Sequence, residues 1–548
     1  MRIRVGLAVS MFGIAFPFAR SSAQNAGVPT PPRLVVVLVV DQMRADYLDR
    51  FGGLFTSGLR QMVEEGAVFT EARHDHAFTA TAPGHATLAS GVYPARSGIV
   101  ANDWWDRRAA RRVYAVEDTT EPVLDHPDLE GRSPRNLLRT TVADWLKAAS
   151  PNSLVFSVAI KDRVAVLLGG HHPDGAYWYD YRTGRYVTSA YYEPSYPDWI
   201  GMFNDSGPVP GFLGKTWTKM APDSVYVLSR EDSFPAEHHG VRTTFPHPVD
   251  VGDTTVPVYE ELARTPFGDM ATLTLARRAV EELHLGADAT PDLLFIGASS
   301  ADLIGHRYGP RSQEVEDYYL RLDRMVGDLL AFFDDRIGRD GYVVVLSADH
   351  GVAMMPEEAV RHGYTGAERL NVNAFRTELV SGFRAGLQDA QIFQPPRLSF
   401  QSVGLVFRFG DEAVTEAQRM TLRTDVAHSL LGAPAIVKTY TYDQLLRGET
   451  DDPDYGGLFL HSFHPDRAGD VVIRFRKHDI FPDVIPATHG SPYDYDRHVP
   501  LIFFGGGIPH RVITRQVRTV DVAPTVAGLL GVIPPDDLDG HALPEVGR

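Results

Sequence analysis

The sequence contains no cysteine among its 548 residues. This absence excludes disulfide bonds, thiolate zinc sites and a cysteine nucleophile, and it is compatible with either redox compartment. Any metal ligands must therefore be Asp, Glu or His. Basic residues are also in the minority, with 53 Lys and Arg against 70 Asp and Glu and a formal net charge of −17. Because no basic stripe interleaved with aromatic residues is present, we expect no nucleic acid partner.

Long apolar runs are scarce as well, and the one near the N-terminus predicts export. Arg2 and Arg4 precede an apolar stretch from Val5 to Ala19, and the small residues Ser21, Ser22 and Ala23 follow. This pattern predicts a signal peptide over residues 1–23, cleaved after Ala23, and hence a periplasmic or secreted protein. A membrane anchor is the alternative, but the run is shorter than the roughly 20 residues of a spanning helix. No later segment predicts a membrane span.

Strand and helix patterns alternate along the rest of the chain. Residues 34–40 are an unbroken Val-rich run, typical of a strand buried on both faces. Apolar residues spaced one, three and four apart over 47–63 predict a helix. Further strands are predicted at 293–296, 342–346 and 499–504, and further helices at 315–330 and 522–530. This alternation predicts an α/β domain, residues 24–548, with a mostly parallel central sheet flanked by helices.

Two stretches break the alternation. Roughly residues 165–265 are rich in Tyr, Trp, Pro and Gly, with hairpin-like pieces such as 177–186. Roughly residues 365–480 contain alternating segments at 403–409 and 471–475, typical of half-exposed antiparallel strands. We interpret both stretches as α+β insertions over the sheet.

Carboxylate and imidazole side chains gather where the predicted strands end, which is where open parallel sheets bind ligands. The set comprises Asp41, Asp302, His306, Asp349, His350 and His489, the last of which precedes the strand at 499–504. Taken singly, each has an ordinary alternative, such as a helix N-cap for Asp41 or a structural role for His489. Taken together, six oxygen and nitrogen donors suit two zinc ions with three ligands each, with manganese or iron as chemical alternatives.

Thr81 is the candidate nucleophile. Pro83 fits the first turn of a helix that runs to Ser90 and stops at Gly91, which places Thr81 at or near the N-cap. A helix N-terminus attracts an anion, and metal coordination would lower the pKa of the hydroxyl enough for it to attack. Thr79 is the neighbouring rival, and without metal ligands nearby Thr81 would be an ordinary capping residue.

These motifs carry a close resemblance to the alkaline phosphatase superfamily. The similar segments are TAPGHATLASGVYPARSGIVAND, DLIGHRYGP, SADHG, THGS and DVAPTVAGLLG, which cover the predicted sheet core and leave both insertions unmatched. A threonine nucleophile is similar to the nucleotide pyrophosphatase/phosphodiesterase branch and to PafA-type bacterial alkaline phosphatases. The enteric-type enzymes instead use Ser and an additional magnesium site, for which we find no ligands.

The resemblance implies a three-layer sandwich and a function for each site residue. One zinc would be held by Asp302, His306 and His489, and the other would be held by Asp41, Asp349 and His350 and would bind Thr81. Asn102 matches the residue that donates to a nonbridging phosphoryl oxygen, a task that suits an uncharged NH₂ group.

The segment AIKDRVAVLLGG bears on the kind of ester. A strand predicted at 154–160 ends in Lys161, Asp162 and Arg163, so Lys161 and Arg163 are expected to point to the same side. This pair resembles the Lys-x-Arg element of PafA-type phosphatases, and two cations suit the extra charged oxygen of a phosphate monoester. A solvated charge pair is the alternative. We therefore predict an alkaline phosphatase that acts on small-molecule phosphate monoesters through a phosphothreonine intermediate.

Three other functions remain open at this point. The nearest is a phosphodiesterase or nucleotide pyrophosphatase with the same two metals. A sulfatase is disfavoured because its formylglycine precursor requires Cys or Ser in place of Thr81. The third is a non-catalytic phosphate- or metal-binding protein. The sequence leaves the oligomeric state and the physiological ester open.

Overall fold

The computed structural model describes residues 31–249, 256–410, 413–481 and 485–547. The predicted signal peptide lies outside these residues. In the part of the chain that is described, we find no helix with the length and hydropathy needed to cross a membrane.

A ten-stranded sheet forms the centre of the described residues, in the order β17-β2-β16-β11-β1-β10-β5-β6-β7, with β18 beside β2. The strands are β1 (Leu34–Val40), β2 (Ala67–Arg73), β5 (Val155–Ala159), β6 (Gly175–Tyr179), β7 (Tyr186–Val187), β10 (Asp292–Ala298), β11 (Tyr342–Ser347), β16 (His498–Gly505), β17 (Arg511–Ile513) and β18 (Val517–Arg518). Neighbouring strands from β11 to β6 run parallel, whereas β16 runs antiparallel to both β11 and β2. The predicted mostly parallel sheet is confirmed.

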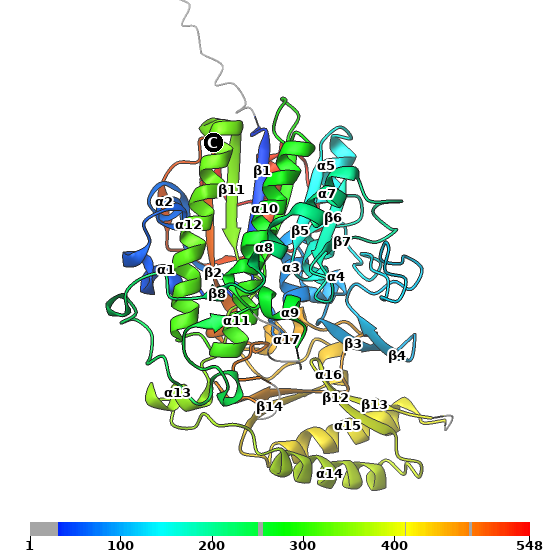
Figure 1. Ribbon diagram of the computed structural model, residues 1–548. Coiled ribbons are helices and arrows are strands. Elements are labelled where there is room, and N and C mark those ends of the chain that lie inside the picture. The colour runs from blue at the N-terminus through cyan, green and yellow to red at the C-terminus, as the bar shows by residue number, and fades with distance from the viewer. Residues whose placement is uncertain (1–30, 250–255, 411–412, 482–484, 548) are drawn as a thin grey trace, which may run out of the picture. The chain divides into compact units, whose positions relative to one another are not determined.

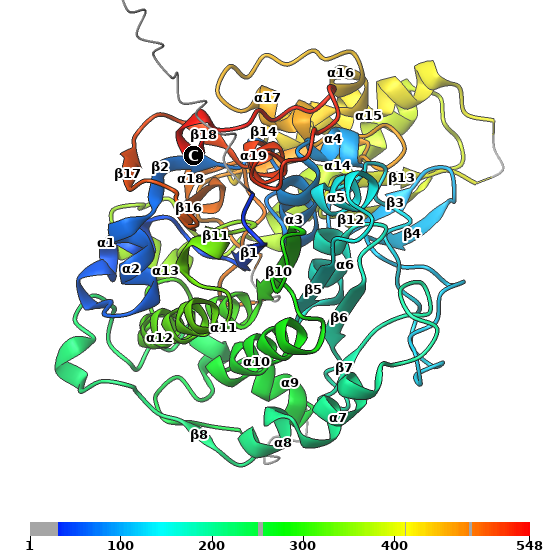
Figure 2. The same cartoon turned by 90° about the horizontal axis from the view of Figure 1, so that it is seen from above.

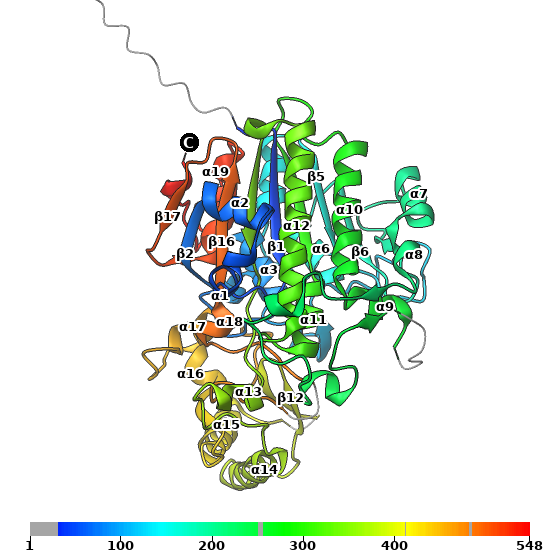
Figure 3. The same cartoon turned by 60° about the vertical axis from the view of Figure 1, so that its left-hand side comes forward.

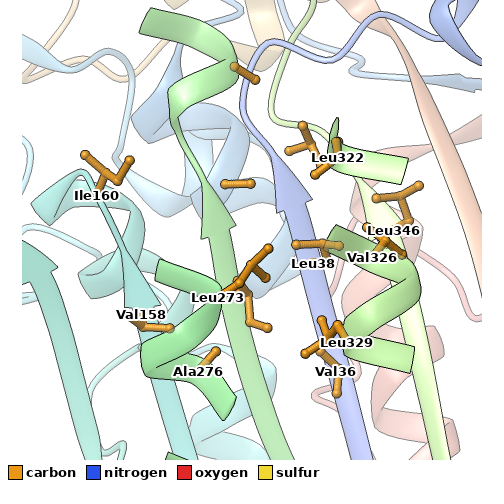
Figure 4. Packing of buried hydrophobic residues seen from close by; sticks show 14 of the residues in the cluster. Val36, Leu38, Val158, Ile160, Leu273, Ala276, Leu322, Val326, Leu329 and Leu346 are labelled. Carbon is orange, nitrogen blue, oxygen red and sulfur yellow. The ribbon is translucent and has the colours of Figure 1, made fainter. Parts of the chain in front are cut away.

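Helices cover both faces of the sheet. Alternate residues of a strand point to opposite faces, so the apolar strands present side chains to helices on both sides. The helices of one face are α10 (Pro266–Glu282) and α12 (Gln313–Arg336), and those of the other are α3 (Thr81–Ser90), α5 (Val142–Ala149), α6 (Asp162–Gly169) and α19 (Val522–Leu529). Figure 3 shows α10 and α12 side by side over the central strands. Val36 and Leu38 of β1 belong to the core under these two helices (Figure 4). Val35 and Val37 belong to the opposite core. These three layers are those of the predicted α/β sandwich.

The single helix predicted over 47–63 is wrong. The chain forms α1 (Asp46–Arg50), a 3₁₀ turn (Gly52–Leu54) and α2 (Gly58–Glu65). Gly52 and Gly53 disfavour a continuous helix. The break is stabilised from outside the segment, since the Asp323 carboxylate of α12 accepts hydrogen bonds from the backbone N–H groups of Ser57 (2.8 Å) and Leu59 (2.9 Å).

The first predicted insertion begins later than residue 165. Its hairpin-like piece forms β6 and β7, which extend the central sheet: β6 pairs parallel with β5, and β7 pairs antiparallel with β6. All five residues of β6 are buried, as expected for a strand covered on both faces. The insertion therefore starts after Val187, with α7 (Asp198–Ser206), α8 (Pro208–Phe212), β8 (Thr216–Trp217), β9 (His247–Pro248) and α9 (Val258–Ala263).

The second insertion contains a separate antiparallel sheet, in the order β12-β13-β15-β14 (Figure 1). Its elements are α14 (Val372–Asp389), β12 (Arg397–Gln401), β13 (Gly404–Arg408), α15 (Glu416–Leu430), β14 (Ile436–Thr441) and β15 (Val471–Phe475). The segments predicted as antiparallel strands at 403–409 and 471–475 form β13 and β15 and pair antiparallel. The expectation that they are half-exposed is wrong, because most of their residues are buried. Leu405 and Phe407 of β13 pack with Leu379 of α14 and Leu422 of α15, so the two helices cover one face of this sheet.

Candidate active site

The centre of the sheet brings four chemically active strand ends side by side. The adjacent parallel strands β11, β1, β10 and β5 lead respectively into Asp349 with His350, into Asp41, into Asp302 and into Lys161. Neighbouring strands lie about 4.8 Å apart. Side chains that are distant in the sequence therefore meet at one edge of the sheet.

His489 reaches the same edge because of the direction of β16. This strand is antiparallel to β11, so the residues before it lie beside the ends of the parallel strands. The carbonyl oxygen of Thr79 lies 2.7 Å from His489 Nδ1, which leaves Nε2 for a ligand. The Thr79 hydroxyl donates to the Ser491 carbonyl at 2.9 Å. Thr79, the rival to Thr81, is thus held in a structural contact.

Asp302, His306 and His489 form one group of potential metal ligands, with one donor atom of each within 4.8 Å of the others. Asp302 and His306 lie four residues apart on α11 (Ser300–Tyr308) and so share a face of that helix. Asp302 Oδ1 is 3.1 Å from His306 Nε2 and 3.6 Å from His489 Nε2. The Ala487 carbonyl lies 2.8 Å from His306 Nδ1 and orients that ring.

A second group lies beside the first. Donor atoms of Asp41, Asp302 and His350 lie within 4.8 Å of one another, and Asp349 Oδ2 is 3.2 Å from His350 Nε2. Asp302 thus lies between the two groups. Asp41 Oδ1 and His350 Nε2 are buried without a hydrogen-bond partner. Such atoms are costly unless something binds them, so these oxygen and nitrogen donors fit a pair of divalent cations.

Lys161 places a positive charge between the two carboxylates. Its Nζ lies 2.5 Å from Asp41 Oδ2, 2.6 Å from Asp302 Oδ2 and 3.4 Å from Thr81 Oγ1. Burial alone would raise the pKa of Asp302, but the His306 and Lys161 charges hold that pKa well below its usual value. Burial and the Asp349 charge raise the pKa of Asp41 well above its usual value, against the effect of Lys161. Three carboxylates, those of Asp41, Asp302 and Asp349, surround the single Lys161 ammonium at this edge of the sheet, and such an excess of carboxylates favours the binding of cations.

Thr81 is the first residue of α3, one position after the N-cap Ala80. The N-cap residue Ala80 makes no side-chain hydrogen bond to the helix. Asn102 caps the helix instead, because its Oδ1 accepts a 2.8 Å hydrogen bond from the Ala82 N–H. Gly84 allows α3 to lie against the Asp349 backbone, since a Cβ at this position would come 2.2 Å from the Asp349 carbonyl oxygen. The helix that begins with the nucleophile candidate is thereby held against Asp349, the candidate ligand that follows β11.

Lys161 and Arg163 do not sit on one strand. β5 ends at Ala159, Lys161 is the N-cap of α6, and Arg163 is the second residue of that helix, so the two-residue strand period does not apply. Both side chains nevertheless line one cavity of about 250 Å³. Tyr114 OH donates to Asp162 Oδ1 at 2.5 Å and accepts from Arg163 Nη1 at 3.3 Å. A tertiary contact with Tyr114, rather than the strand period, therefore holds Arg163 in the cavity that Lys161 also lines.

Sequence reasoning missed two residues that support the candidate ligands. Gln42 Nε2 donates to Asp302 Oδ1 at 2.6 Å, and its backbone N–H donates to Asp349 Oδ1 at 3.1 Å. His85 Nδ1 lies 3.3 Å from Asp349 Oδ2 and 2.8 Å from the Thr81 carbonyl oxygen. The available signals were the position of Gln42 directly after Asp41 and the position of His85 one helical turn after Thr81.

The chain is similar to known proteins along almost its whole length. Alkaline phosphatase PafA of Elizabethkingia meningoseptica is 32% identical over 551 residues, covering 98% of each chain. Alkaline phosphatase PhoV of Synechococcus elongatus is 32% identical over 538 residues, covering 94% of this chain and 93% of its own. The crystal structure of wild-type PafA aligns with a TM-score of 0.85 at 30% identity, over 94% of this chain and 99% of PafA.

More distant likeness extends to animal proteins. Murine ectonucleotide pyrophosphatase/phosphodiesterase 5 aligns with a TM-score of 0.51 at 14% identity, which shows a shared fold. The sequence profile of the family described as type I phosphodiesterase / nucleotide pyrophosphatase matches residues 35–387. These residues contain Asp41, Thr81, Asn102, Lys161 and Arg163 together with the candidate ligands from α11 and the end of β11. The chain belongs to the type I phosphodiesterase/nucleotide pyrophosphatase family.

Proposed function

We propose that this protein is an exported, metal-dependent phosphate monoesterase of the alkaline phosphatase type. One observation carries the assignment to monoesters: Lys161, 3.4 Å from Thr81 Oγ1, lines the same cavity as Arg163. A cation beside Thr81 and a second cation in the same cavity suit a dianionic phosphoryl group, whereas a diester carries an uncharged substituent in place of one charged oxygen. The relatives named alkaline phosphatase support hydrolysis of phosphate esters.

The donor set is suited to two zinc ions. Asp302, His306 and His489 would hold one, and Asp41, Asp349 and His350 the other, with Asp302 near both. When bound, the ions would lower the pKa of the Thr81 hydroxyl and stabilise negative charge on the leaving oxygen.

Four residues of the chain have separate roles in the proposed reaction. Thr81 Oγ, having lost its proton to solvent, attacks phosphorus as the bond to the leaving oxygen breaks, giving a phosphothreonine and an alcohol that takes a proton from water. Asn102, Lys161 and Arg163 hold the nonbridging oxygens while charge moves across them. Water then attacks the phosphothreonine, inorganic phosphate departs, and Thr81 regains its hydroxyl.

A phosphodiesterase or nucleotide pyrophosphatase is the second candidate, and the family profile favours it. Both functions would use the same nucleophile and the same ligands. The difference between them lies in one nonbridging position on phosphorus, which carries a charged oxygen in a monoester and an ester group in a diester, and Lys161 and Arg163 favour charge at that position.

The deciding experiment combines metal analysis with the ratio of turnover of an aryl phosphate to turnover of its methyl diester. We expect two zinc ions per chain and a ratio that favours the monoester, and we expect a Lys161→Ala/Arg163→Ala double variant to lower that ratio. An unchanged ratio would remove the monoester assignment. A Thr81→Ala variant that kept its metals and full turnover would remove the phosphothreonine step.

Export rests on the sequence pattern of residues 1–23 alone. Sequencing the N-terminus of the protein recovered outside the cytoplasm tests it, with Gln24 as the expected first residue. A mature protein that still begins at Met1 contradicts cleavage.

A further inference from the structure

A large cavity lies between the second insertion and the candidate metal site. It has a volume of about 820 Å³, within the range of pockets that hold small molecules. Thr488, His489 and Gly490 line it on the side of the metal site, and residues of β12, β13 and β15 line it on the side of the insertion. A molecule that fills it therefore reaches from a candidate metal ligand to the small antiparallel sheet.

The wall formed by the insertion carries polar groups without partners. Arg408 pairs with Arg397 across β12 and β13, and Ser399 and Gln401 lie two and four residues further along, so these side chains share the sheet face that α14 and α15 leave free. Arg408 Nε, Ser399 Oγ and Gln401 Oε1 are buried without a hydrogen-bond partner. We also find no carboxylate paired with Arg408 among the described residues. Unpaired buried polar atoms of this kind are a reason to expect a ligand.

The remaining wall is aromatic. Trp105 of β3 (Asp103–Asp106) lies beneath the Arg408 guanidinium, with 4.8 Å between Cζ and the ring centroid. Phe400 and Phe481 also line the cavity, with ring centroids 5.4 Å apart. The hairpin formed by β3 and β4 (Arg111–Tyr114) lies next to β12 and β13 in Figures 1 and 2, consistent with the Trp105 contact. Flat rings and a flat guanidinium are surfaces on which a planar ring system stacks.

We propose that this cavity binds the leaving group of the substrate, and that this group is a planar aromatic ring system with hydrogen-bond acceptors. His489 belongs to the ligand group Asp302–His306–His489 and also lines the cavity, so a leaving group held at that ligand group adjoins the cavity. Arg408 donates to its acceptors, and Trp105 stacks against its ring. A nucleoside and an aryl alcohol share this chemistry. The identity of the substrate as a phosphate ester rests on the proposed function, whereas binding of the aromatic group in the cavity does not.

The kinetic test compares each ester across variants, so that differences in intrinsic reactivity cancel. The esters are adenosine 5′-monophosphate, phenyl phosphate and glycerol phosphate. For Arg408→Ala and Trp105→Ala we expect kcat/KM to fall about three- to tenfold with an aromatic ester and less than about twofold with glycerol phosphate. Equal losses on all three esters, or no loss on any, would overturn the proposal.

Three further variants distinguish the two kinds of leaving group, replace Arg408→Ala if it does not fold, and provide a control. Gln401→Ala distinguishes the two sources: a loss confined to adenosine monophosphate assigns the nucleoside, and an equal loss on phenyl phosphate assigns the aryl alcohol. Arg408→Lys keeps the charge without the flat stacking group, and it serves if Arg408→Ala does not fold. Arg447→Ala is the matched control, because Arg447 belongs to the same insertion, pairs with Glu449 at 2.8 Å and does not line the cavity.

A direct binding measurement tests this proposal independently of the proposed function. Adenosine and phenol, which carry no phosphate, are titrated into the wild-type protein and into Arg408→Ala by calorimetry. We expect at least one of them to bind the wild type and to bind Arg408→Ala more weakly, even if no ester is hydrolysed. Absence of binding by both compounds at millimolar concentration would overturn the proposal while leaving the hydrolysis of phosphate esters standing.

Discussion

Asn102 accepts a hydrogen bond from the backbone N–H of Ala82, with 2.8 Å between Oδ1 and N. The contact ties the residue before the β3–β4 hairpin to the start of α3, the helix that begins with the proposed nucleophile Thr81. It also fixes the orientation of the amide, because the carbonyl oxygen is engaged by Ala82. Among the described residues we find no protein acceptor for the NH₂ group, which is thus available to a phosphoryl oxygen.

Replacing Asn102 tests this arrangement. We expect Asn102→Ala to lower kcat by about 10²- to 10³-fold, the usual effect of losing one donor to a developing oxyanion. Asn102→Asp keeps an acceptor for Ala82 but replaces the donor by negative charge, so its loss should be at least as large. Turnover of an aryl phosphate measures both variants, and a loss under twofold in Asn102→Ala would contradict the role.

Gly84→Ala tests the close approach of α3 to Asp349. Because the added Cβ would come 2.2 Å from the Asp349 carbonyl oxygen, we expect a loss of about 1 to 3 kcal/mol in stability together with weaker metal binding. Gly201→Ala in α7 is the matched control, since a Cβ there meets nothing within 4 Å. Thermal unfolding midpoints and metal content compare the two, and equal behaviour would show that the contact relaxes without cost.

Tyr114→Phe removes the hydroxyl that joins Asp162 to Arg163. We expect kcat/KM for a monoester to fall about tenfold while the rate for a methyl diester changes little, because hydrogen bonds to charged groups contribute about 1.5 to 3 kcal/mol. Tyr181→Phe is the control, as Tyr181 lines the same cavity and makes no hydrogen bond through its hydroxyl among the described residues. If both variants behaved alike, Tyr114 would not position Arg163.

Asp496 predicts a pH dependence of stability. Burial raises the pKa of this carboxyl to about 7 from 3.8, although Ser491 donates to Oδ2 through its N–H (2.8 Å) and its hydroxyl (2.6 Å). The folded protein therefore holds a proton that the unfolded chain releases, and stability falls as pH rises from about 4 to about 7. The loss is at most about 4 kcal/mol.

An Asp496→Asn variant should lack this contribution to the pH dependence of stability. Its amide can still accept from Ser491 and carries no charge at any of these pH values. Free energies of unfolding at pH 5 and pH 8 give the measurement, and the decrease between them should be smaller in the variant than in the wild type. An equal decrease in both proteins would place the titrating group elsewhere.

Much of the fold follows from local pattern. The buried Val-rich run of β1, the start of α3 and its end at Gly91 were predictable because period, capping and glycine conformation act over a few residues. The helix predicted over 47–63 failed because its apolar spacing continues across Gly52 and Gly53, which disfavour a continuous helix. The capping carboxylate of Asp323 is more than 250 residues away along the chain.

The sequence by itself determined which side chains could do chemistry here: its lack of cysteine left Asp and His as ligands, and its motifs singled out Thr81, Lys161 and Arg163. The tertiary structure decided how they meet. Strand order sets Asp41 between the residues after β10 and β11, and the antiparallel direction of β16 brings His489 to the same edge. It also decided that Gln42 and His85 support the ligands and that Arg408 lines a cavity reaching His489. The physical reason is that strand order, strand direction and helix packing depend on contacts between distant segments, which no local period encodes.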